Sequence, residues 1–175
     1  MTNRLNTNEL PAAAEVLRAG DRVLLSGEVY TARDAAHKRI AALLDQGAAL
    51  PFPLEGACIY YAGPTPTPPG RVIGSCGPTT SGRMDPYTPR LLAHGLRGMI
   101  GKGERGAAVV EAIRSHRALY FCAIGGAGAL AAQCVAACRE TAFPELGCES
   151  VKRLTLRELP LIVAIDAFGN DLFAR

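Results

Sequence analysis

The sequence predicts an α/β fold for a single domain that spans residues 1–175. Short apolar runs that suit strands alternate with amphipathic segments that suit helices through most of the chain. Hydrophobic residues make up 49% of the 175 and charged residues 20%, which is typical of a compact globular domain. No internal repeat and no linker composition divides the chain, and a domain of this length can bury roughly 70% of its unfolded surface.

The first part of the chain is predicted to form a helix, a strand and a second helix. A weak apolar repeat predicts a short helix over 8–19, and the apolar residues of 21–30 predict a strand. Thr31 is expected to cap the next helix, because Thr-x-x-Asp is a capping pattern and Asp34 suits the first turn. Gly47 is expected to end this helix.

The middle of the chain predicts short strands separated by loops. Residues 58–62 form one apolar run, and the prolines of 63–70 predict a stiff loop without regular structure. Residues 71–75 are expected to be a strand that leads into a glycine-rich loop. A short helix follows over 87–94, and another strand is expected over 96–100.

The last part of the chain continues the alternation of helices and strands. The expected segments are a helix over 106–114, a strand over 118–124, a helix that starts at the glycines of 125–128 and continues through 133–138, strands over 151–154 and 161–165 on either side of Pro160, and a turn over 166–170. The glycine-rich start of the 125–138 helix also suits close packing of helix on strand.

Composition and charge argue against several classes of protein. No apolar run approaches the roughly 20 residues of a membrane helix, and residues 1–9 lack the apolar centre of a signal peptide, so a cytoplasmic protein is expected. The net charge is +3, and 16 of the 19 basic residues are arginines scattered along the chain. With 6% aromatic residues and no basic run, a nucleic-acid partner is not expected.

The six cysteines do not form a metal-binding pattern. None belongs to a Cys-x-x-Cys pair, and the tightest spacing is between Cys134 and Cys138. Disulfides are not expected in a cytoplasmic setting, so most of these cysteines are predicted to be small buried hydrophobic residues. Cys76 differs in lying within the glycine-rich loop.

The loop from Gly74 to Pro86 carries the strongest chemical signal. Its sequence, Gly-Ser-Cys-Gly-Pro-Thr-Thr-Ser-Gly-Arg-Met-Asp-Pro, places backbone N–H groups, hydroxyls and the Arg83 guanidinium close together. The spacing is not that of a phosphate-binding loop. The loop therefore predicts a site for a small anion such as a carboxylate. Lys102, between two glycines at the end of a predicted strand, can reach a ligand as well.

The 77–85 segment, Gly-Pro-Thr-Thr-Ser-Gly-Arg-Met-Asp, resembles a signature of class I, iron–sulfur-dependent fumarases and tartrate dehydratase beta subunits. Six further segments resemble that family in the same order: 31–39 (Thr-Ala-Arg-Asp-Ala-Ala-His-Lys-Arg), 61–66, 100–103, 123–126, 143–147 and 166–171. The resemblance covers residues 10–173. It implies the swivelling β/β/α domain of this family, with a mixed sheet and helices packed around it.

The resemblance implies roles for four residues, and two more are expected to support them. Thr79 would be the base that exchanges a proton with the substrate's carbon, and a turn role is the alternative. Arg33, Arg83 and Lys102 would bind the dicarboxylate. Apart from the resemblance, His37 is expected to be a hydrogen-bonded neighbour that orients Arg33. A salt bridge with nearby Asp85 is the structural alternative for Arg83, and both roles could hold.

The implied function is that of the beta subunit of a hydro-lyase, most simply one that converts fumarate and water to (S)-malate. The [4Fe-4S] cluster and its cysteines would belong to an alpha subunit, in a heterotetramer or dimer of heterodimers, and its open iron would act as Lewis acid. No metal ligand is therefore assigned to this chain. The alternatives are a tartrate dehydratase beta subunit, a hydratase for mesaconate, and a non-catalytic domain that binds small anions.

Overall fold

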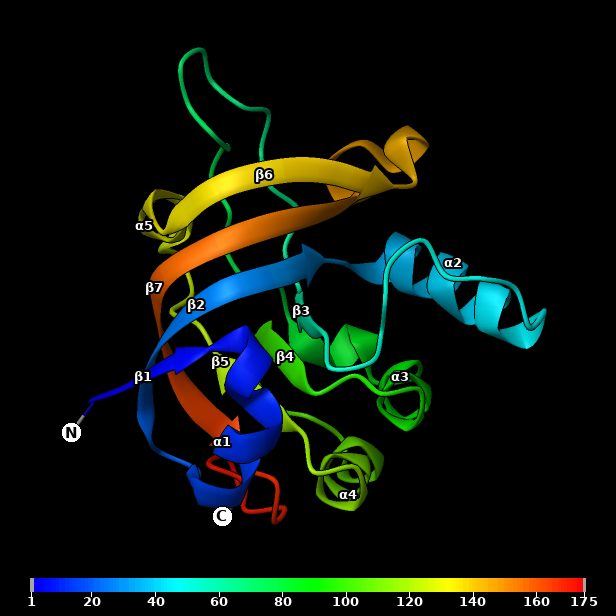
Figure 1. The fold of residues 1–175 in the computed structure, drawn as a ribbon, viewed down its shortest axis with the longest axis vertical. Helices are drawn as coiled ribbons and strands as arrows, with labels where there is room; N and C mark the ends of the chain where they lie inside the picture. The colour runs from blue at the N-terminus through cyan, green and yellow to red at the C-terminus, as the bar shows by residue number, and fades with distance from the viewer. Residues whose placement is uncertain (1, 175) are drawn as a thin grey trace.

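Seven strands form one mixed sheet that closes on itself (Figure 1). The computed structural model describes residues 2–174. The strand order is β1-β2-β3-β4-β5-β7-β6, and an additional β2–β7 pairing joins β2, β3, β4, β5 and β7 into a ring. The strands are β1 (Thr2–Asn6), β2 (Arg22–Thr31), β3 (Cys58–Tyr60), β4 (Gly98–Gly101), β5 (Leu119–Cys122), β6 (Val135–Ala142) and β7 (Val151–Ile165).

Five α-helices pack around this sheet within the described residues, which confirms the predicted α/β class. They are α1 (Leu10–Val16), α2 (Asp34–Asp45), α3 (Thr88–Ala93), α4 (Ala107–Ser115) and α5 (Gly128–Gln133), with 3-10 turns at Thr7–Glu9, Ser81–Met84 and Pro144–Glu149. Helices α2, α3 and α4 lie on one side, whereas α5 lies beside β6 (Figure 1). None of the helices within residues 2–174 is long and apolar enough to cross a membrane.

The alternation of side chains along the strands produces two apolar cores. In β3, Cys58 and Tyr60 face one core, whereas Ile59 faces the other. The first core also receives Leu10, Ala13 and Ala14 of α1 and Ala131 of α5. The second is covered by α2, α3 and α4, with Ile40 of α2 fully buried in it.

Strand β7 is continuous through Pro160, where the sequence predicts two separate strands. Pro160 pairs with Leu24 of β2 on one edge of β7. On the other edge, β6 pairs with β7 as far as Leu156, and β5 pairs only from Ile162 onward. Pro160 lies between these two pairings, so its missing N–H interrupts no ladder.

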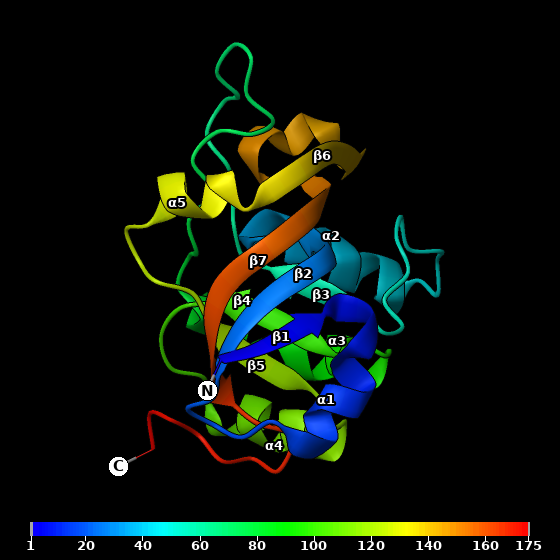
Figure 2. The same cartoon turned by 60° about the vertical axis from the view of Figure 1, so that its left-hand side comes forward.

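Two further predictions were wrong. The 133–138 segment is not helical, because α5 ends at Gln133 and Val135 begins β6, which pairs with β7. Pairing with a long neighbouring strand overrides the helix propensity of the alanines there. Residues 71–75 form no strand; they pack on the proline-rich segment instead, with Thr65 N–H donating to Ser75 O at 3.0 Å. The tip of the 63–75 loop projects beyond α5 and β6 (Figure 2). Strand β1 was not predicted.

Candidate functional site

The predicted site residues gather where three parallel strands end. Strands β2, β3 and β4 run parallel to one another, so their carboxyl ends meet at one edge of the sheet. Arg33 follows β2, Lys102 follows β4, and the loop that carries Thr79 folds back against the end of β3. Ligand sites in α/β proteins commonly lie at such an edge.

Main-chain hydrogen bonds attach the Thr79 loop to the ends of β3 and β4. The N–H of Thr79 donates to Tyr61 O at 2.7 Å. The N–H of Ser81 donates to Lys102 O at 2.9 Å, and Lys102 N–H donates to the Ser81 hydroxyl at 3.0 Å. Because each partner is the backbone next to a strand end, Thr79 and Lys102 are held at fixed positions relative to the sheet.

The opposite end of the loop is attached to α5 and to the first core. Cys76 N–H donates to Gly128 O at 3.0 Å, and its carbonyl accepts from the Tyr60 hydroxyl at 2.6 Å. A Cβ atom on Gly128 would lie 2.3 Å from Ser75 Oγ, so this close approach requires glycine. Cys76 is fully buried, and burial raises the pKa of its thiol to about 12. It therefore packs as a small hydrophobic residue.

Thr79 and Arg83 are in direct contact. Arg83 Nη2 donates to Thr79 Oγ1 at 2.5 Å across the 3-10 turn. Arg83 Nε lies 3.2 Å from Asp34 Oδ1, so the guanidinium bridges the loop and the start of α2. Thr79 is partly buried and the Arg83 side chain is 48% exposed, which leaves both accessible from solvent.

Arg33 lies at the start of α2 and faces the same carboxylate. Its Nε is 3.8 Å from Asp34 Oδ2 and 3.3 Å from Glu149 Oε1. Arg33 is also the N-cap residue of α2, which corrects the predicted cap at Thr31. Thr31 is instead the buried last residue of β2, where its hydroxyl accepts from Lys152 N–H at 3.0 Å.

His37 lies one turn into α2 and is fully buried. Its Nδ1 is 2.8 Å from the carbonyl oxygen of Arg33, to which it donates when the ring is neutral. The ring packs edge-on against Tyr61 and tilted against Tyr87. Burial is the main reason that the pKa of His37 falls to about 4. The contact with Arg33 is to its backbone, so His37 supports the start of α2.

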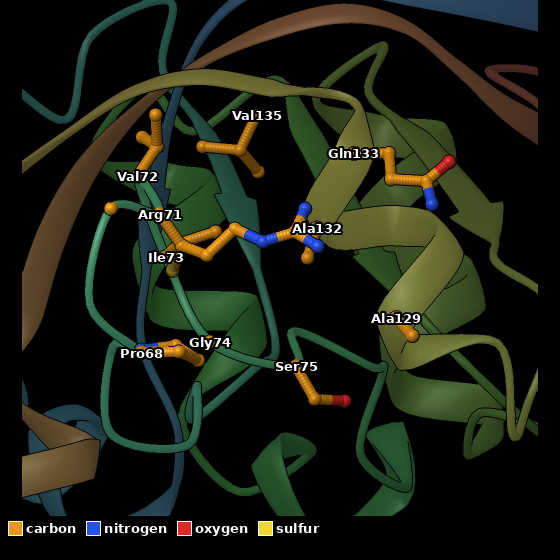
Figure 3. Close-up of a pocket in the computed structure, with 11 residues that line it drawn as sticks. Pro68, Arg71, Val72, Ile73, Gly74, Ser75, Ala129, Ala132, Gln133 and Val135 are labelled. Atoms are coloured by element: carbon orange, nitrogen blue, oxygen red, sulfur yellow. The ribbon is translucent and has the colours of Figure 1, made fainter.

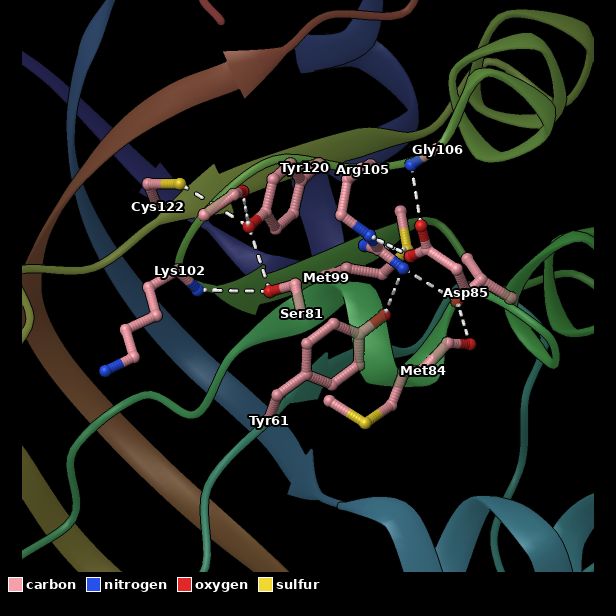
Figure 4. Close-up of polar contacts among 12 residues, drawn as sticks. Tyr61, Ser81, Met84, Asp85, Met99, Lys102, Arg105, Gly106, Tyr120 and Cys122 are labelled. Carbon is pink, nitrogen blue, oxygen red and sulfur yellow. Dashed lines mark hydrogen bonds and ion pairs between the residues drawn. The ribbon is translucent and has the colours of Figure 1, made fainter.

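Asp85 pairs with Arg105 and not with Arg83 (Figure 4). Arg105 Nε donates to Asp85 Oδ1 at 2.6 Å, and the other carboxylate oxygen accepts from Gly106 N–H at 2.6 Å. The ion partner of Arg83 is Asp34 because Arg83 leaves the 3-10 turn toward α2, whereas Asp85 leaves it toward α4. Arg105 carries no recognisable motif, so the sequence did not indicate its role.

The Arg105 guanidinium is surrounded by polar and aromatic groups. Its Nη2 donates to Thr88 Oγ1 at 2.8 Å, and its Cζ lies 5.3 and 4.9 Å from the ring centres of Tyr61 and Tyr120. Burial alone would lower the pKa of Arg105, but Tyr61 and the Asp85 carboxylate raise it above its usual value. This guanidinium therefore stays charged and serves as a fixed support.

Ser81 connects the support to the open edge of the site. Its hydroxyl lies 2.9 Å from the Tyr120 hydroxyl, which also donates to Gly103 O at 2.8 Å. A Cβ atom on Gly101 would lie 1.9 Å from Ser81 Oγ. The Lys102 side chain extends away from this buried network and is exposed (Figure 4). Its ammonium group has no hydrogen-bond or ion partner among the described residues, so it is available to an anion.

A separate pocket of about 480 Å³ lies between the 63–75 loop and α5 (Figure 3). Arg71, Ser75 and Gln133 are its polar lining residues, and Val72, Ile73 and Val135 supply much of its apolar surface. It contains none of the six predicted site residues. The predicted site residues therefore lie outside this pocket, at the open strand edge.

Residues 2–174 do not fit an iron–sulfur cluster. Nowhere in this range do three His, Cys, Asp or Glu side chains gather in a way that could hold a metal ion. All six cysteines are free thiols distributed over different elements.

Comparison with known proteins gives a consistent set of relatives. The family described as "Fumarase C-terminus" matches residues 2–175. "Fumarate hydratase 2" of Leishmania major is 40% identical over 158 residues, which cover 89% of this chain and 28% of the relative. "Fumarate hydratase class I, anaerobic" of Escherichia coli K12 is 40% identical over 154 residues, 87% of this chain and 28% of the relative.

One relative is similar in length to this chain. "Putative L(+)-tartrate dehydratase subunit beta" of Methanocaldococcus jannaschii is 36% identical over 163 residues, which cover 90% of this chain and 84% of the relative. The chain thus spans 28% of the length of the two fumarate hydratases and most of the length of the subunit. From the match over nearly all its residues, we conclude that the chain belongs to the fumarase C-terminus family.

Proposed function

We propose that this chain is the beta subunit of an iron–sulfur-dependent hydro-lyase that interconverts fumarate and (S)-malate. The observation that carries the proposal is the contact of Thr79 Oγ1 with Arg83 Nη2, at a strand edge that also presents Lys102 and Arg33. Fumarate hydratases at 40% identity support the choice of reaction.

In this proposal the cations bind the two carboxylates of the substrate. Arg83 donates one of its five N–H groups to Thr79 and forms an ion pair with Asp34, which leaves further donors for a substrate carboxylate. Lys102 contacts the other end of the substrate or its reacting oxygen. Arg33 contributes from the start of α2. Binding from three separate segments holds the diacid in one orientation.

Thr79 is the proposed acid–base residue. In the direction of hydration its hydroxyl gives a proton to the substrate's carbon, and in the direction of dehydration its alkoxide removes that proton. A threonine alkoxide needs cationic stabilisation, and the guanidinium donor on Thr79 Oγ1 supplies it. The backbone attachment to Tyr61 keeps the oxygen at the strand edge.

We place the [4Fe-4S] cluster on a partner alpha subunit. Support comes from the absence of a suitable ligand set within residues 2–174 and from the word "subunit beta" in the name of a relative of similar length. The partner would complete the site from the open side of the strand edge, in a heterotetramer or dimer of heterodimers. A cytoplasmic location belongs to the same proposal, supported by six cysteines that form no disulfide in the described part of the chain.

A second candidate is L(+)-tartrate dehydration. It is favoured by the relative whose length this chain mostly covers, which is named as a putative subunit of that enzyme. The two substrates differ by hydroxyl groups, so pocket shape and polar contacts decide between them.

The test is anaerobic co-expression with the cysteine-bearing partner, followed by absorbance assays on fumarate, L(+)-tartrate and mesaconate. Turnover of fumarate above the other two diacids supports the proposal. Preference for tartrate or mesaconate would change the assigned substrate and keep the site. Hydration by the purified chain alone would contradict the two-subunit account, and inactivity of the complex on all three diacids would favour an anion-binding domain.

A further inference from the structure

The Asp34 carboxylate lies between the two arginines assigned to the substrate. Its Oδ1 is 3.2 Å from Arg83 Nε, and its Oδ2 is 3.8 Å from Arg33 Nε. Asp34 is the first residue of α2, and its side chain is 40% exposed. The sequence explains Asp34 as a favourable charge in the first helical turn, but that role requires no contact with the neighbouring loop.

The contact with Asp34 restricts the orientation of Arg83. A guanidinium is planar, so one hydrogen bond to a fixed partner together with one ion pair to another restricts the direction of its remaining donors. Arg83 Nε faces Asp34 of α2, and Arg83 Nη2 faces Thr79 of the loop. Without Asp34 the exposed Arg83 side chain could rotate away from Thr79 Oγ1, because no other carboxylate pairs with it among the described residues.

We propose that Asp34 is a positioning residue that aims Arg83 at Thr79. This inference rests on the proposed function and adds a residue to it. Asp34 does not bind the substrate, because a carboxylate repels a dianion. Its negative charge weakens the attraction of the site for a diacid, whereas its geometry keeps a donor on the reacting oxygen.

Because of these opposing effects, a change at Asp34 should lower kcat without raising KM. In Asp34→Asn the charge is removed, so the KM for the diacid should stay constant or fall. The kcat should fall on the order of 10- to 100-fold, because Arg83 is no longer held in the orientation that stabilises the Thr79 alkoxide. Asp34→Glu keeps a carboxylate near Arg83 and should retain more kcat than Asp34→Asn.

The matched control is Asp45→Asn, at the other end of the same helix. Asp45 also pairs with an arginine, since Arg90 Nη1 donates to its Oδ1 at 2.5 Å, but this pair is remote from the strand edge. The kcat and KM of the Asp45→Asn complex should equal those of the original complex. Equal losses of kcat in the two variants would mean a general effect on α2 and would overturn the proposal.

A second measurement is independent of the reaction. Side-chain ¹⁵N NMR of the purified chain should show a slowly exchanging Nε–H signal of Arg83, assigned by its loss in Arg83→Lys. The signal should persist in Asp45→Asn and weaken in Asp34→Asn. An unchanged signal in Asp34→Asn would overturn the contact, and a lost signal with unchanged kcat would overturn its role in turnover. If the unsubstituted complex turns over no diacid, the proposed function fails, while NMR still decides the contact.

Discussion

Arg105 and Asp85 form a buried ion pair behind the loop that carries Thr79. The Arg105 side chain is wholly shielded from solvent, and its Nε donates to Asp85 Oδ1 at 2.6 Å. Because Asp85 also accepts from Gly106 N–H at 2.6 Å, the pair joins the end of the 3-10 turn to the start of α4. This ion pair thus holds the loop that carries Thr79 in place, although neither of its residues is among the proposed substrate-binding residues.

We expect Arg105→Met to destabilise the chain strongly, because it leaves the Asp85 carboxylate without its cation. Breaking one side of a buried pair costs about 3–5 kcal/mol, or on the order of 10 °C in the unfolding midpoint for a chain of this size. Thermal unfolding measures this loss. The control is Arg114→Met, which removes an exposed pair with Glu111 and should leave the midpoint unchanged. Similar midpoints for both variants would show that the Arg105 pair contributes little.

Thr79→Ala should reduce kcat of the complex by about 10²- to 10⁴-fold, the usual contribution of a residue that transfers a proton. Thr79→Ser keeps a hydroxyl within reach of Arg83 and should lose less. Initial rates with saturating diacid measure the effect. Thr80→Ala is the matched control, because Thr80 is adjacent and exposed. Full activity in Thr79→Ala would place the base on the partner.

Gly101→Ala should damage both stability and turnover. Its Cβ would lie 1.9 Å from Ser81 Oγ and 2.8 Å from Tyr61 Cδ2, so the loop between Thr79 and Arg83 must move. Such overpacking costs about 1–3 kcal/mol, measurable by urea unfolding. In Gly125→Ala the nearest atom outside the neighbouring residues is Lys102 Cδ at 3.6 Å, an ordinary contact, so its stability should match the original chain. Equal stability of the two alanine variants would rule out the steric argument.

The stability of the chain should fall in mild acid because of His37. Burial lowers its pKa to about 4, whereas the unfolded chain keeps the usual value of 6.5. The contribution is therefore complete above pH 6.5 and is lost as the pH falls toward 4, by about 3 kcal/mol in all. Urea midpoints from pH 7 to pH 4.5 should decrease less in His37→Asn than in the original chain.

His94 provides the control for this pH dependence. Its Nδ1 also lies 2.8 Å from a carbonyl oxygen four residues earlier, that of Arg90, but the residue is exposed. His94→Asn should keep the full acid sensitivity of the original chain. A loss of sensitivity in His94→Asn, or its persistence in His37→Asn, would contradict the assignment to His37.

The sequence indicated which residues lie together at the strand edge more fully than it indicated the pairing of the sheet. The short motifs around Thr79, Arg83 and Lys102 follow strand ends, and parallel strands bring such ends together. The local sequence of β6 suits a helix, because its partner, β7, begins nine residues after β6 ends and this pairing cannot be read from a local pattern. Pro160 predicts a break, because its position between two pairings depends on where β5 and β6 end.

The roles of Asp34 and Arg105 were not predictable for a similar reason. Asp34 suits the first turn of a helix, and this local role gives no sign of its contact with Arg83, 49 residues later. Arg105 lies 20 residues after Asp85 in a segment without periodicity. Both contacts depend on the angle at which one element leaves the sheet, which only the folded chain determines.

The main-chain attachment of the Thr79 loop has a consequence for how substrate preference can evolve. Tyr61 and Lys102 hold the loop through backbone atoms, which every residue type possesses except for the N–H that proline lacks. Side chains that contact neither Gly101 nor the Ser81 hydroxyl can therefore change one at a time without moving the Thr79 backbone. Under the proposed function, members of the family could diversify among related diacids while they inherit the same geometry for proton transfer.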